Sequence, residues 1–165
     1  FARVNSTNFG TELFWKRAAT EVGNYLFVAT GSDWDDGTLY AVSGCITSET
    51  PIGAVGADNN GTDITAEALG ITTLTANSLL NYVEANFDGF NMDAGGVPAS
   101  MTERFDNDNE YLATQDVASA STATGTKTGT LDAAAEWVAL QFELKSEAAA
   151  GGGATYPGAD GCGVF

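Results

Sequence analysis

The most regular alternation of apolar and polar side chains in this chain lies at residues 136–145, EWVALQFELK. Successive side chains of a β-strand point to opposite faces of the sheet. One face of this segment is wholly apolar and comprises Val138, Leu140, Phe142 and Leu144. The other comprises Trp137, Ala139, Gln141 and Glu143. A helix would spread the same apolar residues around its circumference. The pattern therefore predicts a closing β-strand whose apolar face packs on an opposite sheet.

Other segments of strand length precede this one, separated by clusters of Gly, Asp, Asn and Ser. Residues 24–30 (NYLFVAT) and 38–47 (TLYAVSGCIT) flank an acidic turn, which predicts a hairpin with a long loop. Further strands are predicted within residues 63–74, 99–107, 109–119 and 122–131. Many short strands with turn residues between them are typical of a β-sandwich or barrel.

Two segments fit a helix as well as a strand. Residues 11–22 (TELFWKRAATEV) carry apolar side chains near one helical face, and Gly23 could end the helix. Residues 75–87 (TANSLLNYVEANF) could begin a helix at Thr75 or Ser78. Their Ala and Glu content favours helix, whereas the aromatic residues and neighbouring predicted strands favour sheet.

The order of several motifs resembles the later part of a non-catalytic jelly-roll domain, a family found in tailed-phage structural proteins and bacterial secreted proteins. The motifs are GTELFWKRA, NYLFVAT, GTLYAVSGCITSETPIGA, ITTLT, LLNYVEANF, TERFDN and DAAAEWVALQFELKSE, and together they cover residues 11–147. The resemblance implies that residues 11–17 and 79–87 are strands. Cys45 stands where the family usually has a small or apolar residue, and the family's early strands have no counterpart here. Together with a start at Phe1 rather than Met, this suggests processing or further residues upstream.

The fold class predicted from pattern and resemblance is all-β, an antiparallel, jelly-roll-like β-sandwich with at most one or two short helices. Its predicted bounds are residues 1–147. Residues 148–165 (AAAGGGATYPGADGCGVF) have the composition of a linker, and they are predicted to form either a flexible tail or an arm that docks on a neighbouring subunit. Such an arm would use Tyr156 and Phe165 as its apolar contacts.

The chain is strongly acidic, with a net charge of −16 and only six basic residues among 165. This charge argues against nucleic acid and anionic membranes as partners. The sequence has no His, so a Ser-His-Asp triad, a Cys-His dyad and a His-ligated zinc site are excluded within it. Paired carboxylates could serve a glycosidase, but no spacing in the sequence indicates that two of them face each other. We therefore predict that the chain is not an enzyme.

Three acidic turns invite comparison with calcium sites, because calcium is bound by carboxylate, amide and carbonyl oxygens. They are SDWDDG, DNNGTD and FDNDNE, and none matches the twelve-residue calcium loop. The best-placed pair is Asp106 and Asp108. The alternative is that these residues simply form turns, which favour Asp, Asn and Gly. No other cofactor is predicted.

Trp34 is the most suggestive candidate for a binding residue, because it lies at a predicted hairpin tip between Asp33 and Asp35. An exposed ring among acids could stack on a sugar or pack against a neighbouring subunit. Cys45 and Cys162 either form one disulfide that ties the tail to the body, or remain a buried core thiol and a free tail thiol.

The function expected from these observations is that of a self-assembling structural protein, a decoration, fibre or tail component of a virion surface. Its partners would be copies of itself and other virion or surface proteins. The alternative is a secreted or cell-surface module that binds carbohydrate or mediates adhesion. The expected location is accordingly the virion or the extracellular surface.

Overall fold

The computed structural model describes residues 2–6, 12–18, 39–93, 95–147 and 161–164, and these residues form an all-β protein. The strands are β1 (Ala2–Ser6), β2 (Glu12–Arg17), β3 (Tyr40–Ser43), β4 (Ile52–Val55), β5 (Asn59–Gly61), β6 (Thr65–Ala68), β7 (Ser78–Asn86), β8 (Thr102–Asn107), β9 (Glu110–Val117), β10 (Lys127–Thr130), β11 (Trp137–Leu144) and β12 (Gly161–Val164). The described residues include no helix of the length and hydropathy that a membrane span requires.

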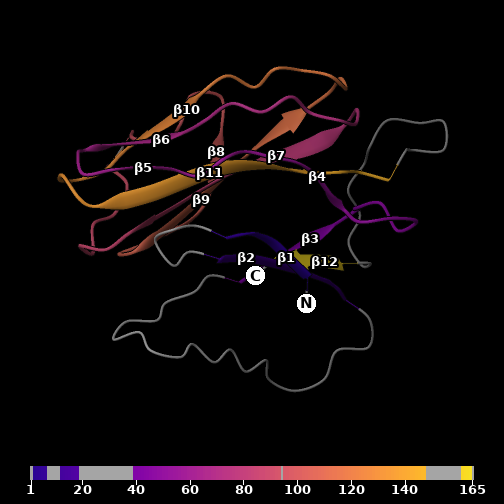
Figure 1. The fold of residues 1–165 in the computed structure, drawn as a ribbon, viewed down its shortest axis with the longest axis horizontal. Coiled ribbons are helices and arrows are strands. Elements are labelled where there is room, and N and C mark those ends of the chain that lie inside the picture. Colours follow the sequence, from indigo (N-terminus) through magenta and orange to yellow (C-terminus); the bar gives the residue numbers. More distant parts are fainter. Residues whose placement is uncertain (1, 7–11, 19–38, 94, 148–160, 165) are drawn as a thin grey trace.

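The strands form three antiparallel sheets, which lie in layers (Figure 1). The six-stranded central sheet has the order β4-β11-β7-β9-β8, and β5 pairs with the other half of the β11 edge that β4 occupies. The pair β6 and β10 covers one face of this sheet. The third sheet, β1-β2-β12-β3, lies against the opposite face, and we call it the lower sheet. The predicted antiparallel, sandwich-like all-β architecture is confirmed.

Strand β11 lies inside this arrangement, and all eight of its residues are buried. Its predicted apolar face is confirmed, since Leu140, Phe142 and Leu144 pack with Leu13 of β2 and with the partly buried Val42 of β3. Each such side chain contributes about 1.5–3 kcal/mol when fully buried. The other face is also buried, because the layer of β6 and β10 covers it.

That second core combines small and aromatic residues. Trp137 and Ala139 of β11 pack with Ala66 and Ala68 of β6 and with Tyr82 of β7. The Tyr82 hydroxyl donates a hydrogen bond of 2.9 Å to the carbonyl of Ala66, so a polar bond also joins the two layers. The central sheet is therefore fixed on both sides.

The two segments that fitted either helix or strand are strands in the structure. Residues 12–17 form β2 and residues 78–86 form β7, so the helical alternatives are wrong there. Strand β7 pairs along its length with β9 and β11, and its burial on both faces explains why its apolar residues follow no single helical stripe. The hairpin predicted from residues 24–47 lies outside the described residues up to position 38, and its second strand corresponds to β3.

Gly61 allows the Trp137 side chain to lie flat against β5. The two residues are Cα partners, and a Cβ atom at Gly61 would lie 2.5 Å from Cζ2 of the Trp137 ring. We expect Gly61→Ala to lower the free energy of unfolding by about 1–3 kcal/mol, because a rigid, packed ring has to move. Urea denaturation of the variant measures this. The control is Ala57→Ser, a small change at an exposed position. A second glycine such as Gly95 would not serve, because its φ is positive and any side chain there would strain the main chain.

Candidate functional site

An open cleft of about 480 Å³ lies between the lower sheet and the central sheet. One wall is formed by β3 and the turn after it, at residues 40–45. Polar side chains from three strand regions of the central sheet face this wall, namely Asn77 before β7, Arg104 of β8, and Thr114 and Asp116 of β9. Its size falls within the range of small-ligand sites. The cleft is therefore a candidate binding site in the described part of the chain.

Arg104 and Asp116 give the cleft one exposed charge of each sign. Nε of Arg104 donates a hydrogen bond of 2.8 Å to Oγ1 of the buried Thr114, which holds the guanidinium against the sheet. A guanidinium carries five N–H donors, of which this bond uses one. Arg104 can therefore donate to the hydroxyl or carbonyl groups of a neutral polar ligand, and Asp116 can accept from its hydroxyl groups.

Tyr40 connects the two walls of the cleft. Its hydroxyl donates a hydrogen bond of 2.6 Å to Oδ1 of Asn81, which is fully buried in β7. Nδ2 of Asn81 in turn donates to the carbonyl of Leu79 at 3.0 Å. The Tyr40–Asn81 hydrogen bond therefore links β3 to β7 across the cleft, and the second bond orients the Asn81 side chain.

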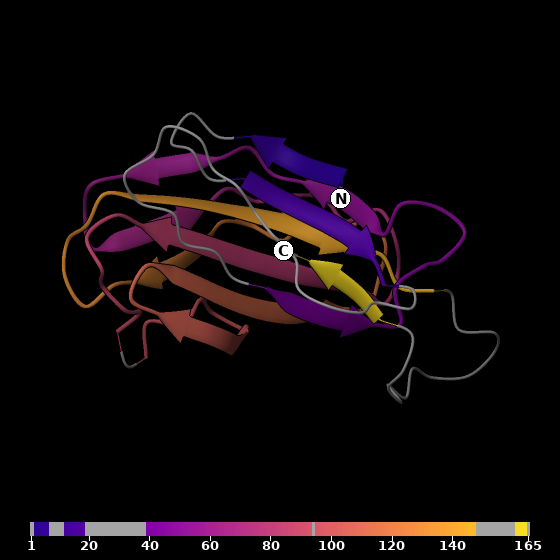
Figure 2. The same cartoon turned by 90° about the horizontal axis from the view of Figure 1, so that it is seen from below.

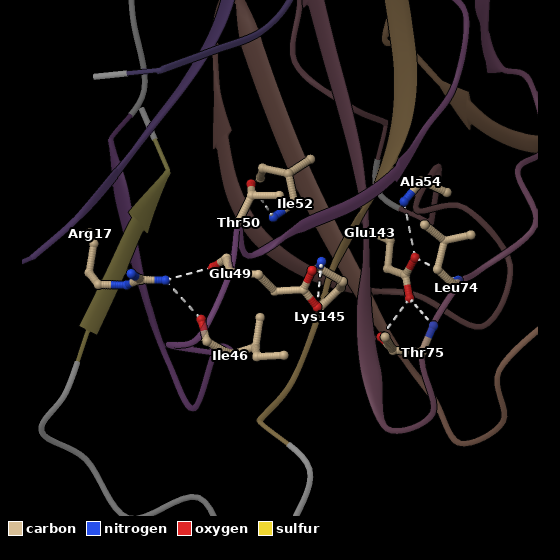
Figure 3. A network of polar contacts seen from close by, with 10 residues as sticks. All are labelled: Arg17, Ile46, Glu49, Thr50, Ile52, Ala54, Leu74, Thr75, Glu143 and Lys145. Carbon is tan, nitrogen blue, oxygen red and sulfur yellow. Dashed lines mark hydrogen bonds and ion pairs between the residues drawn. The ribbon is translucent and has the colours of Figure 1, made fainter.

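At the end of β11 beside the cleft, Lys145 lies in a network of polar contacts (Figure 3). Nζ of the mostly buried Lys145 is 3.1 Å from Oε1 of Glu49. Arg17 of β2 donates hydrogen bonds to the carbonyls of Ile46 and Glu49, at 3.1 and 2.8 Å. The loop at residues 46–49 is thereby held by β2 on one side and by the end of β11 on the other.

Glu143 is a fully buried carboxylate with four hydrogen-bond donors around it (Figure 3). Oε2 accepts from the main-chain N–H groups of Ala54 and Leu74, at 3.0 and 2.8 Å. Oε1 accepts from the N–H and the hydroxyl of Thr75, both at 2.9 Å. Burial alone would raise the pKa of Glu143, but these hydrogen bonds outweigh it and hold the pKa below its ordinary value. The carboxylate is ionised and joins β11 to β4 and to the segment before β7.

Glu84 is buried in a different environment, near the opposite end of β7. It lies between its Cα partners Ala139 of β11 and Tyr111 of β9 and is 4% exposed. Burial, partly opposed by a hydrogen bond with Asn86 and reinforced by the negative charge of Asp106, raises the pKa of Glu84 to about 8. Neither Oε1 of Glu84 nor the Tyr111 hydroxyl has a hydrogen-bond partner among the described residues. Glu84 is therefore mostly protonated at neutral pH.

The predicted calcium pair lies at the end of β8 and in the turn after it. Oδ1 of Asp106 accepts a hydrogen bond of 3.2 Å from the N–H of Met92, and Oδ1 of Asp108 accepts one of 3.3 Å from Nδ2 of Asn91. Both aspartates thus anchor the same neighbouring segment. Within the described ranges, no three His, Cys, Asp or Glu side chains are grouped closely enough to hold a metal ion. Calcium at Asp106 and Asp108 stays a prediction, and their turn-anchoring role is what the structure shows.

The other predicted site residues are placed only in part. Trp34, Tyr156 and Phe165 lie outside the described residues. Cys45 is buried just after β3, and Cys162 is in β12, where its Cα partner on β3 is Val42. A disulfide between the two cysteines stays a prediction.

Sequence reasoning missed the cleft and the buried polar residues. Arg104 and Thr114 lie on the consecutive strands β8 and β9 and Asn77 lies further away in the sequence, and no motif relates the three. Glu143 and Gln141 were assigned to the correct face of β11, but alternation alone does not distinguish a polar face in water from one covered by a second layer.

Comparisons with protein family models, with curated proteins and with solved structures found no match to this chain. The function is therefore argued from the geometry and from the composition of the chain.

Proposed function

We propose that this protein is a non-enzymatic structural subunit that self-assembles, as a decoration, fibre or tail component of a virion surface. The observation that carries the proposal is the use of its buried polar side chains. Three of them, Gln141, Glu143 and Lys127, hydrogen-bond neighbouring segments and layers, and so they strengthen a scaffold.

Two residues of the central sheet and one of the layer formed by β6 and β10 illustrate this use. Nε2 of Gln141 donates to the carbonyls of Ala68 and Gly125, both at 2.9 Å, and so joins β11 to the layer above it. Glu143 of the same strand binds main-chain N–H groups on two other segments. From the upper layer, Nζ of Lys127 donates to the carbonyl of Ala99 and to Oε1 of Gln115, at 3.0 and 2.7 Å. Hydrogen bonds of this kind to buried charged groups are each worth about 1.5–3 kcal/mol.

The virion assignment is supported by the resemblance of the strand motifs to jelly-roll domains of tailed-phage structural proteins. The acidic surface fits a protein that stays soluble until it assembles with copies of itself and with other virion proteins. It also disfavours nucleic acid as a direct partner.

Assembly should depend on salt, because copies that each carry −16 repel one another. At about 1 M salt the screening length falls to about 3 Å. We expect light scattering to show a discrete particle of many 17.0 kDa chains at high salt, and smaller species at low salt. Loss of the particle on adding a calcium chelator would support the calcium prediction at Asp106 and Asp108. A 17.0 kDa monomer at every salt concentration would overturn the proposed function.

The cleft favours a second candidate, a secreted or cell-surface module that binds carbohydrate. Sugars are recognised by aromatic faces together with groups that hydrogen-bond hydroxyls, and the cleft holds Tyr40, Asn77, Arg104 and Asp116. A protein that stays monomeric and changes its tryptophan fluorescence on adding a glycan would support this candidate. In that case Asp116→Asn should weaken binding, and Asp88→Asn, at an exposed site outside the cleft, should not.

A further inference from the structure

The C-terminal strand β12 occupies the middle of the lower sheet. It lies between β2 and β3, as Figure 2 shows for the yellow strand. Its residues pair with Arg17, Lys16 and Trp15 on β2, and with Ser43, Val42, Ala41 and Tyr40 on β3. Without β12, the β1–β2 hairpin would not be joined to β3 in this sheet. The strand therefore fills a slot with two edges, both of which require a main-chain partner.

The sequence of β12 is GCGV, with two glycines and no charged residue. In strand addition, main-chain hydrogen bonds supply most of the affinity, and a strand of small, neutral residues enters without desolvating a charge. The slot would make the same hydrogen bonds with this strand from any copy of the chain. Local concentration then decides which copy supplies it.

The chain is long enough to reach another copy. Residues 148–160 separate the end of the central domain from β12, and 13 residues can span up to about 45 Å. A compact chain of this length is about 40 Å across. The strand can thus reach either its own slot or one in a neighbour.

We propose that β12 is a donor strand that fills the slot between β2 and β3 of a second copy when the protein assembles. This inference rests on the proposed self-assembly. Exchange replaces each contact of the lower sheet by an identical one, so it adds little energetic cost, and it connects copies in a defined order. The partner recognised by the slot is therefore the C-terminal strand of this same protein.

Cysteine cross-linking distinguishes donation within one chain from donation between chains. Arg17 and Val42 are the Cα partners of Cys162 on the two sides of the slot. In a Cys45→Ala background, Arg17→Cys or Val42→Cys brings a thiol opposite Cys162, within the separation that a disulfide bridges. The control Lys16→Cys is one residue out of register and lies on the other face of β2.

The full-length variants are assembled at high salt, oxidised with oxidised glutathione, and analysed on a denaturing, non-reducing gel. We expect the 17 kDa band of both pair variants to shift to covalent dimers and larger multiples, and the Lys16→Cys band to remain in place. Cross-linked chains that still migrate as monomers would overturn strand exchange. So would an absence of cross-links in both pair variants, since β12 would then occupy no slot.

Light scattering of the same samples before oxidation separates this inference from the function on which it rests. An assembled particle whose chains cross-link only within themselves would overturn strand exchange and leave self-assembly standing. A protein that stays monomeric, with cross-links only within chains, would overturn both strand exchange and self-assembly. The exposed Arg17 and the partly buried Val42 differ in their structural demands, so loss of folding in one variant leaves the other for the test.

Discussion

Raising the pH from about 4.5 to 8 should lower the free energy of unfolding by about 4–5 kcal/mol through Glu84 alone. The reason is that burial raises the pKa of this carboxyl from 4.5 to about 8 in the folded protein. Each pKa unit corresponds to about 1.4 kcal/mol of difference between the two protonation states. In this pH range the folded state holds a proton that the unfolded state has released, so stability falls as the pH rises. The stabilising contribution of protonated Glu84 is fully present at pH values below 4.5, its pKa in the unfolded protein. It is lost at pH values above about 8, its pKa in the folded protein.

The environment of Glu84 accounts for this effect. Its neighbours on the same face of the central sheet are the apolar parts of Tyr82 and Tyr111, whose rings meet edge to face at 6.0 Å. Asp106 adds a negative charge, and its own pKa is raised by burial and by neighbouring carboxylates, so it titrates in the same direction. Burial raises the pKa of both tyrosines above its ordinary value, and they stay neutral throughout this range. No Lys or Arg is among the groups that shift the pKa of Glu84.

The test is urea denaturation of the protein and of Glu84→Gln at several pH values between 4 and 9. We expect the variant to lose most of the decline in stability and to be the more stable protein above pH 8. Glu67→Gln, at an exposed position of β6, is the matched control and should leave the decline unchanged. Equal pH dependence in the protein and in Glu84→Gln would show that Glu84 is not the buried neutral acid.

The amino-acid sequence predicted the elements whose patterns are set locally. The alternation at residues 136–145 located β11 and assigned its two faces correctly, since a strand separates odd and even residues wherever it lies in the fold. The pattern did not reveal that both faces are covered. That depends on the pairing of β6 with β10, which lie about 60 residues apart in the sequence.

Sequence reasoning also could not predict the structure and environment of residues that are determined by contacts with distant segments of the chain. Strand β12 contains two glycines within four residues, a composition that favours turns, and only its two neighbours in the lower sheet make it a strand. Glu84 and Glu143 are both glutamates on predicted strands. One is kept neutral and the other ionised by groups that come from distant segments.

Replacing Glu143 by Gln should lower the free energy of unfolding by about 1–3 kcal/mol, because in either orientation the new amide group faces at least one main-chain N–H donor that loses its acceptor. Each carboxylate oxygen of Glu143 accepts from two donors. With the –NH₂ of Gln in place of Oε2, the N–H groups of Ala54 and Leu74 would both lose their acceptor. With the –NH₂ in place of Oε1, the Thr75 hydroxyl could rotate and accept from it, but the Thr75 N–H would lose its acceptor. The carboxyl group also lies against the main chain of β4, since a Cβ atom at Gly53 would be only 2.7 Å from Cδ of Glu143.

The pH dependence of this variant identifies the cause of its instability. The pKa of Glu143 is lowered in the folded protein, so its contribution is present above the unfolded pKa and lost as the pH falls through the folded value. Glu143→Gln should therefore be most destabilising near neutral pH, and its deficit should shrink in acid. Glu147→Gln, at an exposed residue that accepts a hydrogen bond of 3.1 Å from Thr47, should change stability by less than about 1 kcal/mol at any pH. A deficit for Glu143→Gln that stayed constant down to pH 3 would mean that its shape matters and its charge does not. The opposite dependences of Glu84 and Glu143 together predict that the fold is most stable in mildly acidic solution, because Glu84 is then protonated and Glu143 is still ionised.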